Sequence, residues 1–395
     1  MTTDLLELSR AILHGDGGVE KRHPMAAGNR LCEVGDGTAM VESFANVAAF
    51  TTGDGLVLVD TGSAFTAAAV HEAVRGWTDE AFDTAVYTHG HIDHVFGTAV
   101  FDAENVELGR PAATVLAHEE IDHRFDRYAL TAGYNGVINQ RQFQLPAFEW
   151  PTDYRRPDVT YRDQLDVTVG DTRFELHHAR GETDDATWVW VPDRKVVCPG
   201  DLIIWCAPNA GNPQKVQRFA KDWAVALRAM AGLGAELMLP GHGLPVAGAE
   251  DIAMVLNDTA AYLDSLHDQT LALMNEGARL DDILHTVRPP ADLESRPYLQ
   301  PVYDEPEFIV RNVWRLYGGW YDGNPAHLKP APDASFAAEL AALAGGVGAL
   351  ARRAAELAEA GDLRLAGPLA ELATQAPPDD ADAPRVRAEV NEARA

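Results

Sequence analysis

Short apolar runs alternate with amphipathic stretches over the first part of the chain. Residues 56–59 and 84–87 are apolar runs of strand length, and glycines lie on both sides of the first of them. Runs of this kind, bounded by turn residues, are typical of buried strands. Residues 65–77 instead carry apolar side chains at helical spacing. This alternation of strands and helices predicts an α+β fold built in layers.

The layered pattern continues to about residue 248, with one long interruption. A hairpin is predicted at residues 167–178 and an amphipathic helix at residues 219–233. Further strands are predicted at residues 106–108, 114–117, 187–191, 195–197 and 236–239. Residues 119–150 show no clear hydrophobic periodicity and are predicted to be irregular. A segment of that length is more often a lid or a substrate loop than a plain connector.

The character of the chain changes after Gly248. Apolar residues recur at helical spacing in three more segments, at residues 251–276, 280–287 and 308–317. From residue 335 onward the chain is rich in Ala, Leu, Glu and Arg, which are strong helix formers. We therefore predict three parts, which are an N-terminal arm at residues 1–28, a layered domain at residues 29–248 and an all-helical domain at residues 249–395.

Composition limits the partners and the compartment. The chain has 60 acidic and 32 basic residues, which gives a formal net charge of -28. Long-range repulsion opposes binding to nucleic acid or to an anionic membrane, so neither is expected as a partner. The N-terminus lacks the features of a signal peptide, and no apolar run is long enough to span a bilayer. The three cysteines show no C-x-x-C spacing, so a reducing, cytoplasmic location is expected.

Metal-binding chemistry is densest directly after the strand predicted at residues 84–87. His89, His91, Asp93 and His94 fall within six positions. Imidazole nitrogen together with carboxylate oxygen favours a divalent transition metal. The packing is too dense for one tetrahedral ion, so we interpret it as two sites. His89 and His91 would serve one metal, and Asp93 and His94 the other. The alternative is a loop of solvated histidines.

The His-x-His-x-Asp-His run resembles that of the metallo-β-lactamase superfamily. This resemblance implies a four-layer αββα sandwich with two metals at one edge, and three further ligands in a set order. Glu182, in Gly-Glu-Thr, stands where the family usually has Gly-His-Thr, Asp201 follows Pro-Gly, and His242 lies in Pro-Gly-His-Gly. The implied ligand sets are His89, His91, Glu182 and Asp201 for one metal, and Asp93, His94, His242 and Asp201 for the other.

The same resemblance implies roles for several carboxylates. Asp93 and Asp201 are expected to be catalytic as well as metal-binding. Asp60, which ends the strand predicted at residues 56–59, either orients a metal-bound imidazole or only caps the following turn. The cofactors are expected to be two divalent ions, zinc first and iron or manganese as alternatives. Such a pair clamps and deprotonates a water molecule and polarises a substrate oxygen.

The run Gly-Trp-Tyr-Asp-Gly-Asn-Pro at residues 319–325 resembles one branch of that superfamily, the alkyl sulfatases. Members of this branch have a metallo-β-lactamase domain, a helical dimerisation domain and a sterol-carrier-like domain, and this chain covers the first two. The resemblance implies a homodimeric hydrolase of a small-molecule sulfate ester. Two features depart from the family pattern. The bridging carboxylate is Asp rather than Glu, and the loop around Asn212 lacks the usual Arg. Asn139 and Arg141 are the expected substrate-binding residues, with Arg141 receiving the anion.

Other functions on the same fold stay open. The substrate could be a lactone, a carboxylic ester or a phosphoester. The alternative from a different class of function is a diiron enzyme that handles oxygen or nitric oxide, because two carboxylates suit iron. A third hypothesis is a binding or scaffold dimer whose metal site is catalytically inert. The general acid is not assigned, and His177, His178 or another group could provide it.

Overall fold

The structure is a computed structural model that describes residues 5–15, 26, 28–377 and 381–394. It divides into two compact units, Met1–Trp320 and Tyr321–Ala395. Of the predicted arm at residues 1–28, residues 1–4, 16–25 and 27 lie outside the described residues. The helix α1 (Leu5–Leu13) within that arm buries Leu5 and Ile12 in the core of the first unit.

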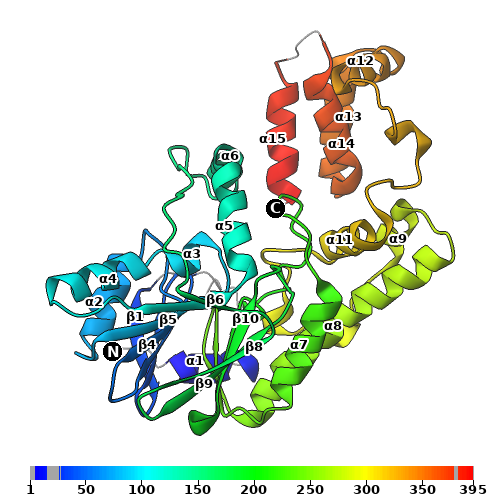
Figure 1. Ribbon diagram of the computed structural model, residues 1–395. Helices are drawn as coiled ribbons and strands as arrows, with labels where there is room; N and C mark the ends of the chain where they lie inside the picture. The colour runs from blue at the N-terminus through cyan, green and yellow to red at the C-terminus, as the bar shows by residue number, and fades with distance from the viewer. Residues whose placement is uncertain (1–4, 16–25, 27, 378–380, 395) are drawn as a thin grey trace. The chain divides into compact units, whose positions relative to one another are not determined.

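The first unit contains a seven-stranded sheet with its strands in chain order. Figure 1 labels β1, β4, β5 and β6 of this sheet. β4 pairs antiparallel with β3 and parallel with β5, so the sheet is mixed. Its strands are β1 (Arg30–Gly35), β2 (Thr38–Glu42), β3 (Val47–Thr51), β4 (Leu56–Val59), β5 (Phe82–Val86), β6 (Thr114–His118) and β7 (Val159–Tyr161).

The apolar runs of this sheet follow from burial on both of its faces. In β4, Leu56 and Leu58 pack in one core cluster, whereas Val57 and Val59 pack in another. Successive side chains of a strand point to opposite faces, so a run with no polar residue fits a strand covered on both sides.

The second sheet has six strands in the order β13-β12-β11-β10-β9-β8. Neighbouring strands are antiparallel except β11 and β12, which are parallel. The strands are β8 (Gln164–Val169), β9 (Thr172–His178), β10 (Thr187–Val191), β11 (Val196–Gly200), β12 (Leu237–Pro240) and β13 (Val246–Ala247). Phe50 of the first sheet and Phe174 of the second meet edge to face, with ring centroids 5.4 Å apart. The two sheets therefore share a core.

Helices cover the outer faces of both sheets. On the first sheet, α2 (Ala67–Arg75), α4 (Thr98–Glu107) and α5 (Glu120–Leu130) contribute Val70, Phe101 and Phe125 to the core. On the second sheet, α7 (Ala220–Ala231) packs along α8 (Ala249–Asn275). The predicted four-layer αββα sandwich is thus confirmed. The remaining helices of this unit are α3 (Ile92–Val95), α6 (Ala132–Gln142), α9 (Leu280–Thr286), α10 (Ala291–Glu294), α11 (Pro306–Gly318) and the short 3-10 turns at Pro192–Arg194 and Pro297–Leu299.

Two predicted elements were wrong. Residues 119–150 do not form an irregular loop, because α5 and α6 occupy most of the segment. Gly133 and Gly136 lower the helix propensity of α6, and so hide it from a sequence pattern. Residues 106–108 are not a strand. They end α4, whose exposed Val106 gave a false strand signal.

The described residues of the second unit form helices without strands, as the composition predicted. These are the 3-10 turn Pro325–His327, α12 (Asp333–Ala344), α13 (Val347–Glu359), α14 (Leu363–Gln375) and α15 (Ala383–Arg394). Asp362 caps α14 by accepting a hydrogen bond from the Leu365 backbone N–H at 3.3 Å. The predicted boundary near residue 248 falls where α8 begins, whereas the first compact unit continues to Trp320.

No single helix among the described residues is long and apolar enough to cross a bilayer alone. One pair, α12 with α13, satisfies length and composition together, but the two helices meet at 84°.

Candidate metal centre

The histidine run lies where β5 leaves the first sheet. Two residues separate the end of β5 at Val86 from His89, and α3 begins directly after His91. One turn of helix then carries Asp93 and His94. The tight turn thus places four donors at one edge of the sheet.

The second sheet contributes the other donors at the same edge. Glu182 lies between β9 and β10, Asp201 directly follows β11, and His242 closely follows β12. Gly200 has a φ of +55°, and a Cβ there would lie 2.8 Å from the Thr88 Cβ. Gly200 therefore allows the two sheets to approach closely beside Asp201.

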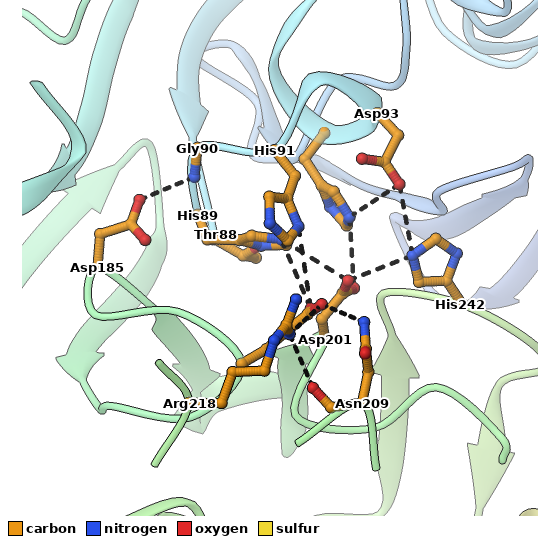
Figure 2. A network of polar contacts seen from close by, with 12 residues as sticks. Thr88, His89, Gly90, His91, Asp93, Asp185, Asp201, Asn209, Arg218 and His242 are labelled. Atoms are coloured by element: carbon orange, nitrogen blue, oxygen red, sulfur yellow. Dashed lines mark hydrogen bonds and ion pairs between the residues drawn. The ribbon is translucent and has the colours of Figure 1, made fainter. Parts of the chain in front are cut away.

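The structure gathers the seven predicted ligands into two groups (Figure 2). In the first group, the ligand atoms lie within 4.8 Å of one another. Its Asp201 Oδ2 is 3.6 Å from His89 Nε2, and Glu182 Oε2 is 3.9 Å from His91 Nδ1. The members of the first group are His89, His91, Glu182 and Asp201.

The second group contains Asp93, His94 and His242, again within 4.8 Å. His242 Nε2 lies 3.6 Å from Asp93 Oδ2 and 3.3 Å from Asp201 Oδ2, while His94 Nε2 lies 3.3 Å from Asp201 Oδ1. Asp201 therefore contacts both groups, which is the geometry that a bridging carboxylate requires.

These donors fit divalent metal ions. An ion with ligand bonds of about 2.0–2.2 Å in a tetrahedron holds its ligand atoms roughly 3.3–3.6 Å apart. His94 Nε2, Glu182 Oε2 and Asp201 Oδ1 are buried and form no hydrogen bond within the described part of the chain. Buried polar atoms are rarely left without a partner, so an ion between these atoms explains their arrangement.

The electrostatics of the site favour the metal-binding protonation states of His89, His91 and Asp201. Burial lowers the pKa of His89 and of His91 well below the usual value, which keeps both imidazoles neutral. Burial alone would raise the pKa of Asp201, but His242, His94 and His89 hold it well below its usual range. A neutral imidazole and an ionised carboxylate are the forms that bind metal.

Asp60 adopts the position expected of a residue that orients a ligand. Its Oδ2 lies 2.7 Å from His94 Nδ1 and accepts a hydrogen bond from the Thr88 hydroxyl at 2.7 Å. Its Oδ1 accepts from the Thr88 backbone N–H at 2.8 Å. These contacts leave His94 Nε2 facing Asp201, so the turn-cap alternative does not account for Asp60.

Glu182 is held by two residues that the sequence pattern did not reveal. Arg218 Nη1 lies 2.5 Å from Glu182 Oε1, and the Asn209 side-chain amide donates to the same oxygen at 2.5 Å. Figure 2 shows Arg218 and Asn209 beside the donor groups. Burial raises the pKa of Glu182 to about 7, although Arg218 opposes this rise. Arg218 therefore compensates the buried charge and turns the other carboxylate oxygen toward the histidines.

The segment that carries Asn209 and Arg218 is fixed by the start of α11. Asp304 accepts a hydrogen bond from the Gly211 backbone N–H at 2.5 Å, and the Asn312 amide donates to the Arg218 carbonyl oxygen at 3.0 Å. A Cβ on Gly211 would lie 2.1 Å from the Phe308 carbonyl carbon. Only glycine allows this close approach.

A second ion-pair cluster fixes the histidine run itself. Asp185 Oδ2 accepts a hydrogen bond from the Gly90 backbone N–H at 2.8 Å, and its Oδ1 accepts from Arg124 Nε at 2.7 Å. Arg124 also pairs with Asp184. These contacts could not be predicted from the sequence, because the partners come from distant segments.

An apolar cavity of about 280 Å³ opens over the metal groups. Five of the seven metal donors line it, namely His91, Asp93, Glu182, Asp201 and His242. Apolar side chains form most of the rest, namely Phe44, Phe65, Ile92, Phe143, Leu145, Phe148, Trp150 and Ile204, with Tyr303 beside them. A largely apolar pocket with a few converging polar groups is typical of a site for a small organic ligand.

The predicted substrate-binding residues and the candidate general acids lie in different parts of the structure. Asn139 is buried and lines the cavity. Arg141 is exposed on α6 and does not line the cavity. In this structure its side chain therefore does not fold over the site as expected. His177 and His178 line a separate groove, where His177 stacks on Trp188. Neither histidine reaches the metal groups.

Comparisons with known proteins match this architecture. The profile described as Metallo-beta-lactamase superfamily matches residues 41–242, and the one described as Alkyl sulfatase dimerisation matches residues 279–395. A linear primary-alkylsulfatase of a Pseudomonas species is 29% identical over 351 residues, covering 83% of this chain and 66% of that protein. An alkyl/aryl-sulfatase of Saccharomyces cerevisiae is 25% identical over 337 residues, covering 78% of this chain and 52% of that protein.

A solved structure extends the likeness. The stereoselective inverting sec-alkylsulfatase Pisa1 of a Pseudomonas species matches with a TM-score of 0.83 and 25% identity, over 93% of this chain and 62% of that one. The chain thus spans about half to two thirds of the length of the relatives it matches. By its sandwich and the superfamily profile over residues 41–242, the chain belongs to the metallo-beta-lactamase superfamily.

Proposed function

We propose that the protein is a metal-dependent hydrolase of sulfate esters that carry an apolar organic group. This proposal rests on one observation: seven metal donors, five of them buried, lie together beside an apolar cavity. The alkylsulfatases among its relatives support sulfate as the ester acid. The mixed nitrogen and oxygen donors suit zinc, and also iron or manganese.

The reaction adds water across the ester bond. An alkyl sulfate and one water molecule give the alcohol and hydrogen sulfate, which then ionises to sulfate and a proton. Two bound divalent ions would lower the pKa of the attacking water and polarise the ester oxygens.

The residues of this chain have distinct parts in that reaction. Asp201 joins the two donor groups, and Asp60 keeps the His94 ring in its ligating orientation. The apolar wall excludes bulk water around the organic group. Tyr303 accepts a hydrogen bond from the Gln142 side chain at 2.7 Å, so its own hydroxyl hydrogen can be donated to a substrate oxygen.

A substrate panel tests the proposal. The metal-loaded protein is expected to release inorganic sulfate from alkyl sulfates, and to act poorly on lactones, carboxylic esters and phosphoesters of matched organic groups. Ion chromatography measures the sulfate. Turnover of the neutral esters or phosphoesters alone would contradict sulfate as the substrate class. An iron-dependent consumption of oxygen or nitric oxide, without hydrolysis, would instead favour the redox alternative.

We also infer that the protein forms a homodimer. Support comes from the dimerisation profile over residues 279–395 and from exposed apolar side chains in that stretch, including Trp320, Phe336 and Leu343. Sedimentation at micromolar concentration is expected to give twice the chain mass of 42.8 kDa. A clean monomer would contradict the inference.

A further inference from the structure

The cavity needs a cation if its substrate is a sulfate ester. The donor groups hold three carboxylates, and the whole chain carries a net charge of -28. Two divalent ions would carry four positive charges, and these three carboxylates with one bound hydroxide would balance them, so the loaded site would be near neutral. A local positive charge is therefore required to favour an anionic ester over a neutral one.

Two arginine side chains near the site are already paired with carboxylates. Arg218 pairs with Glu182 and donates to the Asn209 carbonyl oxygen at 2.7 Å. Arg124 pairs with Asp184 and Asp185. Neither guanidinium lines the cavity.

Lys215 differs from these arginines. Among the described residues, it is the only Lys or Arg that lines the cavity, and no hydrogen bond or ion pair joins its Nζ to another described residue. Burial lowers the pKa of Lys215, and the nearby Arg218 lowers it further. The carboxylates of Glu182 and Asp93 oppose this lowering of the pKa from a distance. A partly desolvated ammonium that makes no direct ion pair is stabilised when an anion binds beside it.

The surroundings of Lys215 define what kind of anion fits. It shares the cavity wall with Glu182 and Asp93 of the two donor groups, and with apolar residues such as Phe44, Trp150 and Ile204. A ligand that satisfies all of these surfaces has an anionic head and an apolar body. The backbone N–H of Lys215 donates a hydrogen bond to the Asn212 carbonyl oxygen at 3.2 Å, so a turn holds the backbone at this position.

We propose that Lys215 binds the anionic group of the substrate and so selects sulfate esters over neutral esters of the same organic group. This proposal rests on the proposed function and assigns the cation to Lys215 rather than to the exposed Arg141. Lys215 is thus a specificity-determining residue that belongs to neither metal-donor group.

The test compares two inert ligands that share one alkyl chain. Octanesulfonate carries the anionic head but has no ester bond to hydrolyse, whereas octanol is neutral. Calorimetry on the metal-loaded protein is expected to show that Lys215→Met weakens octanesulfonate binding by about 10- to 100-fold, the range for a lost hydrogen bond to a charged group. Octanol binding and metal content are expected to stay unchanged, and Lys215→Arg is expected to recover most of the sulfonate affinity.

Two matched variants complete the design. Lys221→Met removes a lysine that pairs with Asp264 outside the cavity wall, and it is expected to bind octanesulfonate as the parent does. Arg141→Met is likewise expected to have no effect. The proposal is overturned if Lys215→Met binds octanesulfonate normally, if it loses octanol binding equally, or if Arg141→Met shows the larger loss.

This outcome is separable from the proposed function. If the parent protein binds octanesulfonate through Lys215 but hydrolyses no sulfate ester, the anion site stands and the reaction fails. If sulfate esters are hydrolysed and Lys215→Met binds octanesulfonate as the parent does, the reaction stands and the anion site fails.

Discussion

Replacing Asp201 with Ala is expected to lower the occupancy of both metal ions and to abolish hydrolysis. Asp201 is the one ligand whose carboxylate approaches both donor groups, with Oδ2 near His89 and His242 and Oδ1 near His94. Elemental analysis of the purified variant would measure the bound metal, and sulfate release would measure activity.

The Asp201 experiment has a matched control. Asp222 is a half-exposed carboxylate that pairs with Arg180 and lies outside the metal groups. Asp222→Ala is therefore expected to retain two metals per chain. Full retention of both ions by the Asp201 variant would refute its assignment as the bridging ligand.

Replacing Arg218 with Met is expected to weaken metal binding in the first donor group and to spare the second. Arg218 is buried and directly pairs with Glu182. Removing one partner of a buried ion pair leaves the other charge uncompensated. This lowers the free energy of unfolding by on the order of 3–5 kcal/mol. Glu182 would then take up a proton more readily, and a protonated carboxyl is a poor metal ligand.

Metal titration of this variant is expected to show one tight site in place of two, and chemical denaturation a lower free energy of unfolding. Arg180→Met is the control, since Arg180 is half exposed on the surface. If Arg218→Met does not fold, Asn209→Ala removes the second contact to Glu182 at a smaller cost to folding. Unchanged affinity of both sites in both variants would contradict the assigned role of Arg218.

The metal ligands could be proposed from the sequence because several lie in short motifs that directly follow strands and that resemble those of the superfamily, and their assignment stays a prediction. His89 follows β5, Asp201 follows β11, and His242 follows β12, so local patterns carried both the residue types and their placement. The sandwich was predictable for a similar reason, since strands buried on two faces read as unbroken apolar runs.

The supporting residues were not predictable, because their contacts join distant segments. Glu182 and Arg218 are 36 positions apart, and no periodicity links them. The aromatic cavity wall is assembled from Phe44, Trp150 and Tyr303, which belong to separate loops. Lys215 had no sequence signal beyond being a cation in an acidic chain. Arg141 lies outside the cavity wall. Its assignment to the anion and the cytoplasmic location both stay predictions.

Metal dependence of sulfate release tests the central claim most directly. The purified chain would be stripped with a chelator, reloaded stepwise with zinc, and assayed at each step for inorganic sulfate released from one alkyl sulfate. The account predicts no release by the stripped protein and full activity as the second equivalent binds. Sulfate release that persists after both ions are removed, or none after both are bound, would contradict it.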